Sequence, residues 1–280
     1  MREIHVDQIA ETVARLVQEA NYTLSPDVKE ALNKLQSLEE APVGQAVMLQ
    51  IVENYTIAET EHVPMCQDTG VAMVFLEIGQ DLHLVGGSLT EAINAGVAKG
   101  YTEGYLRMSM LNDPIKRVNT RNNTPALIYT EIVPGDQLKI TVDCKGGGSE
   151  NMSRLAMLPP SAGWEGAKRF IIETVANAGP NACPPMLVGV GIGGNFDKSA
   201  LLAKKSLLRH TGQPNPDPEW AAREKELFDE INKLGVGPMG LGGTQTCFGV
   251  HIEVMGCHIT ALPVAVNIEC HSHRHKEATL

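Results

Sequence analysis

The opening part of the chain spaces its apolar residues as amphipathic helices do. Apolar residues recur at helical intervals over residues 5–20, a pattern that predicts a helix with one buried face. A second run of this kind covers 28–38. Pro42 stands near the start of a third, which extends to about Tyr55, as is common for a proline in the first helical turn. We therefore expect the N-terminal portion, about residues 1–60, to be mostly helical.

Beyond this region the apolar runs are shorter and read as strands between helices. Strands are expected at 71–78, 126–133, 137–144, 186–192, 248–254 and 258–267, and helices at 89–106, 164–177, 197–208 and 219–234. Ser88 and Glu91 form a capping box before the first of these helices. The turn residues Pro134, Gly135 and Asp136 predict a hairpin between the second and third strands. Because strands and helices are mixed without regular alternation, we expect an α+β fold, with 1–280 as a single domain.

Composition and charge exclude several classes of function. The chain has 280 residues, of which 43% are apolar and 20% charged, as in an ordinary globular protein. Its net charge of −10 argues against nucleic acid as the main partner. We see no apolar run that approaches the ~18 residues of a transmembrane helix, and no N-terminal apolar segment typical of a signal peptide. We therefore expect a cytoplasmic protein with no membrane or nucleic-acid partner.

Six cysteines carry the most specific chemistry of the sequence. In a reducing compartment they are expected to be thiols or metal ligands, and the absence of a C-x-x-C pair argues against a zinc ribbon or a thioredoxin-type motif. Cys66, Cys183 and Cys270 each lie in a candidate loop flanked by Gly, Pro or polar residues. Three thiolates can hold three irons of a four-iron cluster and leave the fourth open as a Lewis acid, which suits a hydro-lyase.

The other cysteines and the tail have more ordinary interpretations. Cys144 and Cys257 lie in strand-like runs, so we expect both to be small buried hydrophobes. Cys247 competes with Cys270 as the third ligand. The tail His271–His275 contains alternate histidines, which we expect to be exposed and solvated rather than a dedicated metal site.

Two glycine-rich segments are candidates for ligand binding. Lys145–Asn151 has three consecutive glycines followed by polar residues, so its main-chain N–H groups suit a carboxylate or phosphate. The alternative is a flexible hairpin end. Gly189–Gly194 follows a strand and precedes a helix, but its glycines lack the G-x-G-x-x-G spacing, which disfavours nucleotide binding.

Several motifs, in the same order along the chain, resemble the iron–sulfur, class I, fumarate hydratase family. They are Cys66-Gln67-Asp68-Thr69-Gly70, Tyr105-Leu106-Arg107, Asn119–Pro125, Lys145–Asn151, Cys183-Pro184-Pro185, Gly191–Gly194, Gly240–Gly243, Gly256-Cys257-His258 and Asn267–His271. The resemblance covers nearly the whole chain. It implies a [4Fe–4S] cluster with one iron not ligated by protein, and it assigns the ligands to Cys66, Cys183 and Cys270.

The same resemblance implies roles around the open iron. Gln67 and Asp68 would face it, with Asp68 part of the proton relay, and Arg107 would hold a substrate carboxylate. The loop of Gly147 would line the same pocket.

Ser149 and Asn151 complete the expected substrate-binding set on that glycine loop. His258 would reach the active site of a neighbouring subunit in an α–α dimer. The alternative for His258 is a buried structural histidine.

Single-chain members of the family continue into a second domain that supplies an arginine, a threonine and a lysine. This sequence ends shortly after Cys270, so it resembles the α subunit of the two-subunit form, with a β subunit as partner. The resemblance implies reversible hydration of fumarate, a small dicarboxylate, to L-malate. The α subunit of L-tartrate dehydratase is of the same kind. An alternative of another class is a non-catalytic, cluster-binding redox sensor, although a sensor gains nothing from a substrate-shaped arginine and glycine loop.

Overall fold

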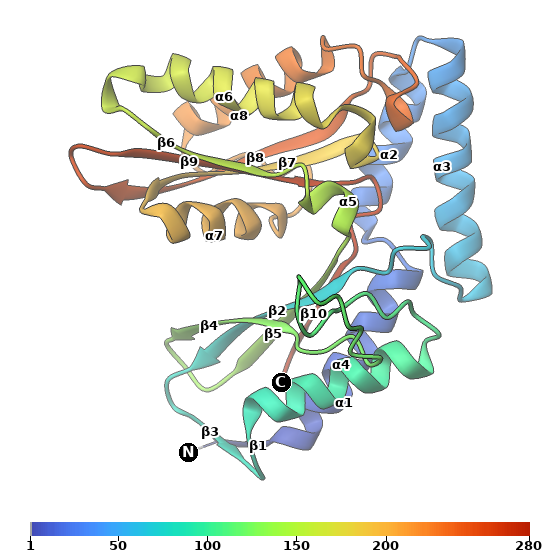
Figure 1. Ribbon diagram of the computed structural model, residues 1–280, viewed down its shortest axis with the longest axis vertical. Helices are drawn as coiled ribbons and strands as arrows, with labels where there is room; N and C mark the ends of the chain where they lie inside the picture. Colours follow the sequence, from blue (N-terminus) through green and yellow to red (C-terminus); the bar gives the residue numbers. More distant parts are fainter. Residues whose placement is uncertain (1) are drawn as a thin grey trace. The chain divides into compact units, whose positions relative to one another are not determined.

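The computed structural model describes residues 2–280 and has the expected α+β fold (Figure 1). The internal contacts of the chain divide it into two compact units. The first unit comprises residues 2–25, Asn54–Gly147 and Arg274–Leu280, and the second comprises Pro26–Glu53 and Gly148–His273.

The N-terminal region is mostly helical, as its apolar spacing predicts. After the short strand β1 (Arg2–His5) come α1 (Val6–Tyr22), α2 (Pro26–Leu38) and α3 (Pro42–Glu61). The ring of His5 caps α1, since its Nδ1 accepts the main-chain N–H of Asp7 at 3.3 Å. Among the described residues, no helix combines the length and the apolar character needed to cross a membrane.

The larger sheet of the first unit has the strand order β10-β5-β2-β4. Its strands are β2 (Val71–Gly79), β4 (Leu127–Val133), β5 (Leu138–Lys145) and β10 (His275–Thr279). Strand β2 is parallel to β4 and antiparallel to β5. The predicted hairpin between β4 and β5 is therefore wrong, because β2 lies between them.

The physical reason lies in β2 and in the glycine at its end. The stretch Ala72–Leu76 is buried throughout, and a strand without a polar face is stable only where neighbours cover it. The turn that leads from β4 to β5 passes the end of β2 at Gly79. A Cβ atom on Gly79 would lie 2.4 Å from the carbonyl oxygen of Gly135, so the connection can pass there only because Gly79 has no side chain.

Helix α1 packs against this sheet, and α4 (Leu89–Glu103) packs on α1 to complete the core of the first unit. Helix α4 begins at the predicted cap, where Ser88 Oγ accepts the N–H of Glu91 at 3.4 Å. It packs along α1, and a Cβ on Gly96 would lie 2.4 Å from the carbonyl oxygen of Ala10. The short strand β3 (Leu82–Val85) pairs in parallel with β1.

The second unit is built on a sheet with the order β6-β9-β7-β8. Its strands are β6 (Arg154–Leu158), β7 (Met186–Gly194), β8 (Cys247–Cys257) and β9 (Leu262–Glu269). Its helices are α5 (Gly147–Glu150), which starts at the unit boundary, α6 (Gly163–Ala178), α7 (Phe196–Leu207) and α8 (Pro218–Asn232), with single 3-10 turns at Pro160–Ala162, Gly179–Ala182 and Pro238–Gly240. Helices α6 and α8 cover one face of the sheet and α7 the other (Figure 1).

The glycines of β7 serve the packing of α7. A Cβ on Gly191 would lie 2.0 Å from the carbonyl oxygen of Ser199, and one on Gly189 would lie 2.3 Å from that of Ala203. Helix and strand can approach this closely only because neither glycine carries a side chain. The glycine-rich spacing therefore has a structural explanation that involves no nucleotide.

Candidate functional site

Sheet geometry brings two predicted motifs together in the first unit. The Cys66–Gly70 loop directly precedes β2. Strand β5 ends at Lys145, and Gly146 and Gly147 follow it directly. Since the two strands are antiparallel, with Val71 paired to Lys145, the loop and the glycine turn meet at one end of the sheet. Gly70 has φ +76°, and a Cβ there would lie 2.6 Å from the carbonyl oxygen of Cys144, so only glycine fits this position.

Asp68 is held by two main-chain donors at this meeting point. Its Oδ1 accepts the N–H of Gly70 at 3.0 Å, and its Oδ2 accepts the N–H of Gly147 at 2.8 Å. The residue is partly exposed. Each carboxylate oxygen accepts one of these hydrogen bonds and can accept a further one, so the group is oriented and can still contact a ligand.

Thr69 joins Arg107 to the same loop. The Oγ1 of Thr69 accepts the N–H of Arg107 at 2.9 Å and lies 3.3 Å from its carbonyl oxygen. The hydroxyl of Tyr101, on α4, donates to the carbonyl oxygens of Thr69 and Gly70 at 2.8 and 3.1 Å. The main chain of Arg107 is thus fixed, while its side chain is exposed.

Cys66 and Gln67 lie on the outer side of this arrangement. Gln67 is exposed and Cys66 is partly exposed, with its Sγ 3.4 Å from Oε1 of Gln67. The preceding Met65 is anchored by its N–H, which donates to the carbonyl oxygen of Asn21 at 3.1 Å. The first unit therefore brings together five of the predicted site residues: Cys66, Gln67, Asp68, Arg107 and Gly147.

Cys183 and Cys270 lie in neighbouring loops of the second unit. Cys183 has a left-handed backbone, with φ 52° and ψ 63°. Its carbonyl oxygen accepts the main-chain N–H of His271 at 3.3 Å, and Nδ1 of the same histidine lies 3.0 Å from that oxygen. Because His271 follows Cys270 directly, these contacts hold the two cysteine segments side by side.

Ser149 is tied to the segment of Cys270. Its side chain is buried, and Oγ donates to Oε1 of Glu269 at 3.3 Å, while the same oxygen accepts the N–H of Cys270 at 2.9 Å. Asn151 is exposed. The glycine segment forms the single helical turn α5 and is not a hairpin end, because β5 pairs with β2 and β10.

His258 and Cys257 lie at the exposed connection between β8 and β9. Nδ1 of His258 is 2.8 Å from Oγ1 of Thr260 in the same turn, so His258 is not the buried structural histidine of the alternative interpretation. Cys257 was expected to be buried, but it is exposed, with Sγ 3.1 Å from the carbonyl oxygen of Ala261. That expectation was wrong because β8 ends at Cys257, where the chain leaves the sheet for an exposed turn.

Apart from the exposed Cys257, the other five cysteines fall into two classes by burial. Cys144 and Cys247 are buried, and burial raises the pKa of Cys144 to about 12 and that of Cys247 further still. Neither is suited to act as a thiolate, so Cys247 is a poor competitor for Cys270. Cys66, Cys183 and Cys270 are partly exposed, and no cysteine among residues 2–280 forms a disulfide. Each of the three is an accessible thiol on a hydrogen-bonded loop, and such thiols have the donor chemistry that an iron–sulfur cluster requires.

The C-terminal tail contains buried residues that its local sequence pattern does not indicate. The expectation that His271–His275 is exposed was wrong, since His273 and Arg274 are buried and β10 begins at His275. Strand β10 reads His-Lys-Glu-Ala-Thr and lacks the apolar alternation that reveals a half-buried strand. Its place is set by antiparallel pairing with β5. The guanidinium of Arg274 donates to the main-chain carbonyl oxygen of Asp68.

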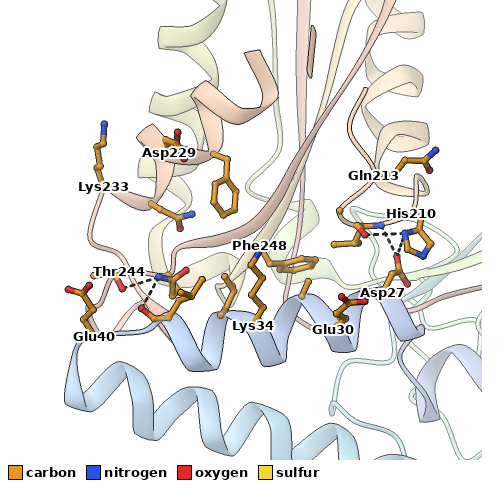
Figure 2. A pocket seen from close by; sticks show the side chains of 18 residues that line it. Asp27, Glu30, Lys34, Glu40, His210, Gln213, Asp229, Lys233, Thr244 and Phe248 are labelled. Carbon is orange, nitrogen blue, oxygen red and sulfur yellow. Dashed lines mark hydrogen bonds and ion pairs between the residues drawn. The ribbon is translucent and has the colours of Figure 1, made fainter. Parts of the chain in front are cut away.

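The second unit also has a groove of about 1040 Å³ along α2 (Figure 2). Its lining includes Asp27, Lys34 and Phe248, so a negative charge, a positive charge and an aromatic ring face the same groove. The carboxylate of Asp27 accepts the N–H of Thr211 at 2.7 Å and lies 3.9 Å from Nδ1 of His210. None of the predicted site residues lines this groove, so it is not the predicted site.

Comparisons with known proteins agree with the family resemblance of the sequence. The family model described as "Fumarate hydratase (Fumerase)" matches residues 10–279. A protein of Methanocaldococcus jannaschii, provisionally named L(+)-tartrate dehydratase subunit alpha, is 43% identical over 95% of each chain. The L(+)-tartrate dehydratase subunits alpha of two Escherichia coli strains, UTI89 and K12, are 34% and 33% identical, over 96% of this chain and 89% of theirs.

Proposed function

Because the chain belongs to the fumarate hydratase (Fumerase) family and is therefore a hydro-lyase, we propose that it is the α subunit of an iron–sulfur enzyme that reversibly hydrates fumarate to L-malate. The observation that carries this proposal is the oriented carboxylate of Asp68. It lies two residues from Cys66 and on the loop that fixes Arg107. A proton-transferring group and a metal-ligand thiol on one short loop, with an anion-binding group fixed to that loop, are what a hydro-lyase of carboxylic acids requires.

The chemistry divides among the residues of the first unit. Removing water from malate breaks a C–O bond and a weakly acidic C–H bond beside a carboxylate. Arg107, with its planar guanidinium, would bind one substrate carboxylate bidentately. Asp68 would take part in moving the proton, since main-chain donors already fix both of its oxygens and no reorientation is needed. Gln67 would contact the substrate from the exposed side of the loop, and the Gly147 turn would line the same pocket.

Cys66, Cys183 and Cys270 would hold a [4Fe–4S] cluster in which one iron has no protein ligand. Such an iron supplies a Lewis acid for the hydroxyl that leaves or adds, without a redox change. Ser149 would support the Cys270 segment through Glu269. Reduced thiols of this kind suit the cytoplasm.

A second subunit is part of the proposal. These relatives are named as alpha subunits, and we infer a β subunit that supplies the remaining substrate contacts. His258 is exposed in the turn before β9, at the opposite end of that strand from Cys270, and this position is compatible with a role in the site of a neighbouring α subunit. An α–α dimer is therefore included. Asn151, also exposed, would face the substrate or the partner.

L(+)-tartrate is the second candidate substrate. The names of the relatives favour it, and its dehydration uses the same groups, because tartrate carries the same two carboxylates and a hydroxyl beside an acidic C–H. The choice between the two substrates depends on contacts to the additional hydroxyl of tartrate.

The test is anaerobic reconstitution followed by rate measurements with fumarate, L-malate and L(+)-tartrate, with and without the partner subunit. We expect at most trace activity from the chain alone, because each missing donor to developing charge costs roughly 100–1000-fold in rate. Full activity without the partner would refute the two-subunit form. An assembled complex with an intact cluster and no turnover of any of the three would favour the redox-sensor alternative.

A further inference from the structure

Arg274 is one of two deeply buried cationic residues near the Asp68 loop, the other being Lys145. Arg274 is 2% exposed, and taking a guanidinium out of water is expensive unless it makes specific contacts. Its main chain is fixed by the sheet, because the N–H of Cys144 donates to its carbonyl oxygen at 2.9 Å and His275 pairs with Asp143 at the start of β10. The position of this side chain is therefore set by a rigid element.

The guanidinium of Arg274 lies against two segments that position Asp68: the main chain of Asp68 itself and the Gly146–Gly147 turn. Nη1 donates to the main-chain carbonyl oxygen of Asp68. A Cβ on Gly146 would lie 3.0 Å from Nη2, so the other edge of the guanidinium lies against the turn whose next residue, Gly147, donates to the Asp68 carboxylate. One side chain thus spans the Asp68 main chain and the glycine turn.

This arrangement separates two tasks. The carboxylate of Asp68 is oriented by the N–H groups of Gly70 and Gly147, and the peptide that carries it is held by Arg274. If the peptide moved, the carboxylate would move with it, and an error of about 1 Å in a reacting group can cost on the order of 100-fold in rate.

We propose that Arg274 is a positioning residue that holds the Asp68 peptide and the Gly146–Gly147 turn in register for proton transfer. The part that concerns catalysis rests on the proposed function, in which Asp68 moves the proton. Arg274 touches no substrate in this role. Lysine cannot replace it, because an ammonium lacks the planar fork that reaches two places at once.

The test compares Arg274→Lys with Arg209→Lys in the reconstituted complex of both subunits. Arg209 is also a largely buried arginine, paired with Glu224 and Glu253 in the second unit. Its replacement should lower stability and leave kcat per folded molecule within twofold. Arg274→Lys should lower kcat by roughly 10–100-fold with KM changed less than threefold, a split that simple destabilisation does not produce.

A second measurement is independent of turnover. Amide hydrogen exchange of residues 66–70 and 145–148 should become faster in Arg274→Lys and stay unchanged in Arg209→Lys. Unchanged exchange in Arg274→Lys, or an unchanged kcat, would overturn the inference. A wild-type complex that turns over none of the three substrates would instead refute the proposed function, while the exchange result still decides whether Arg274 holds the loop.

Discussion

The main-chain N–H of Gly147 donates a 2.8 Å hydrogen bond to Oδ2 of Asp68. The donor belongs to the backbone at the end of β5 and the acceptor to the loop before β2, so strand pairing sets the distance between them. A substitution that adds a side chain at position 147 keeps this hydrogen bond, because the donor is the main-chain N–H. Only the loss of that N–H removes it.

Gly147→Pro and Gly147→Ala should therefore behave differently. A Cβ on Gly147 would lie 3.7 Å from Oδ2 of Asp68, an ordinary contact, so we expect the alanine variant to retain activity within threefold. Proline removes the donor at the first residue of α5, where helices tolerate it. Hydrogen bonds to charged groups contribute about 1.5–3 kcal/mol, so the proline variant should lose roughly 10–100-fold in kcat. Equal rates for the two variants would show that the N–H does not matter.

Serine substitutions should separate ligand from non-ligand cysteines. We expect Cys66→Ser, Cys183→Ser and Cys270→Ser each to abolish cluster retention, because a serine hydroxyl is a poor ligand for iron that prefers soft thiolates. Cys257→Ser, at the exposed turn, and Cys144→Ser, inside the sheet, should retain it. Iron and sulfide are measured per chain after anaerobic reconstitution.

Cys247→Ser is the decisive control for that series. Its thiol is buried and its pKa is raised by burial, so we expect this variant to keep the cluster if it folds, which circular dichroism checks. Loss of the cluster in a folded Cys247→Ser protein, together with retention in Cys270→Ser, would reverse the ligand assignment.

Local patterns predicted the helices well because the information lies within each segment. The apolar spacing of α1 and the cap of α4 at Ser88 are short-range features, and both are found. The neighbours of each strand were not predictable in this way. Strand β2 separates β4 from β5, and this order depends on which strand must be covered on both edges, a property of the whole sheet.

The site motifs were recognised from the sequence, but the group that supports them was not. Asp68 and Gly147 stand out as parts of polar, glycine-rich loops. Arg274 lies in a segment of histidines and charged residues whose local pattern resembles a solvated tail. It is buried because β10 pairs with β5, and no short-range signal encodes a pairing between residues more than a hundred positions apart.

Arg107 should control substrate affinity rather than folding. Its main chain is held by Thr69, and its side chain is exposed, so neither Arg107→Lys nor Arg107→Gln should shift the melting temperature appreciably. Loss of a charged hydrogen-bonding partner costs about 1.5–3 kcal/mol, so Arg107→Gln should raise KM for the dicarboxylate roughly 10–100-fold. Arg107→Lys should fall between, because it keeps the charge and loses the bidentate geometry. An unchanged KM in Arg107→Gln would exclude a carboxylate-binding role.

His251 should make the stability of the second unit depend on pH. The ring is buried, with Nδ1 2.9 Å from the carbonyl oxygen of Ser206. Burial, together with the nearby positive charge of Arg209 and the neighbouring His273, lowers the pKa of His251 to about 3, and the hydrogen bond to Ser206 and the charge of Asp27 only partly oppose this. The unfolded chain takes up a proton at the ordinary pKa near 6.5, whereas the folded protein does not. Stability contributed by the neutral ring is therefore complete above pH 6.5 and is lost as the pH falls towards 3.

The expected slope between about pH 6 and pH 4 is roughly 1.4 kcal/mol per pH unit from this group alone. Because carboxylates also titrate in this range, the measurement is the difference between wild type and His251→Asn, whose amide can still donate to the Ser206 carbonyl oxygen but has no titrating group. Both tryptophans of the chain, Trp164 and Trp220, lie in the second unit with ring centroids 6.2 Å apart, so urea unfolding followed by fluorescence reports on this unit. The variant should be less stable at pH 7.5 and lose less stability on acidification. Parallel pH profiles for the two proteins would show that His251 does not titrate on unfolding as its burial requires.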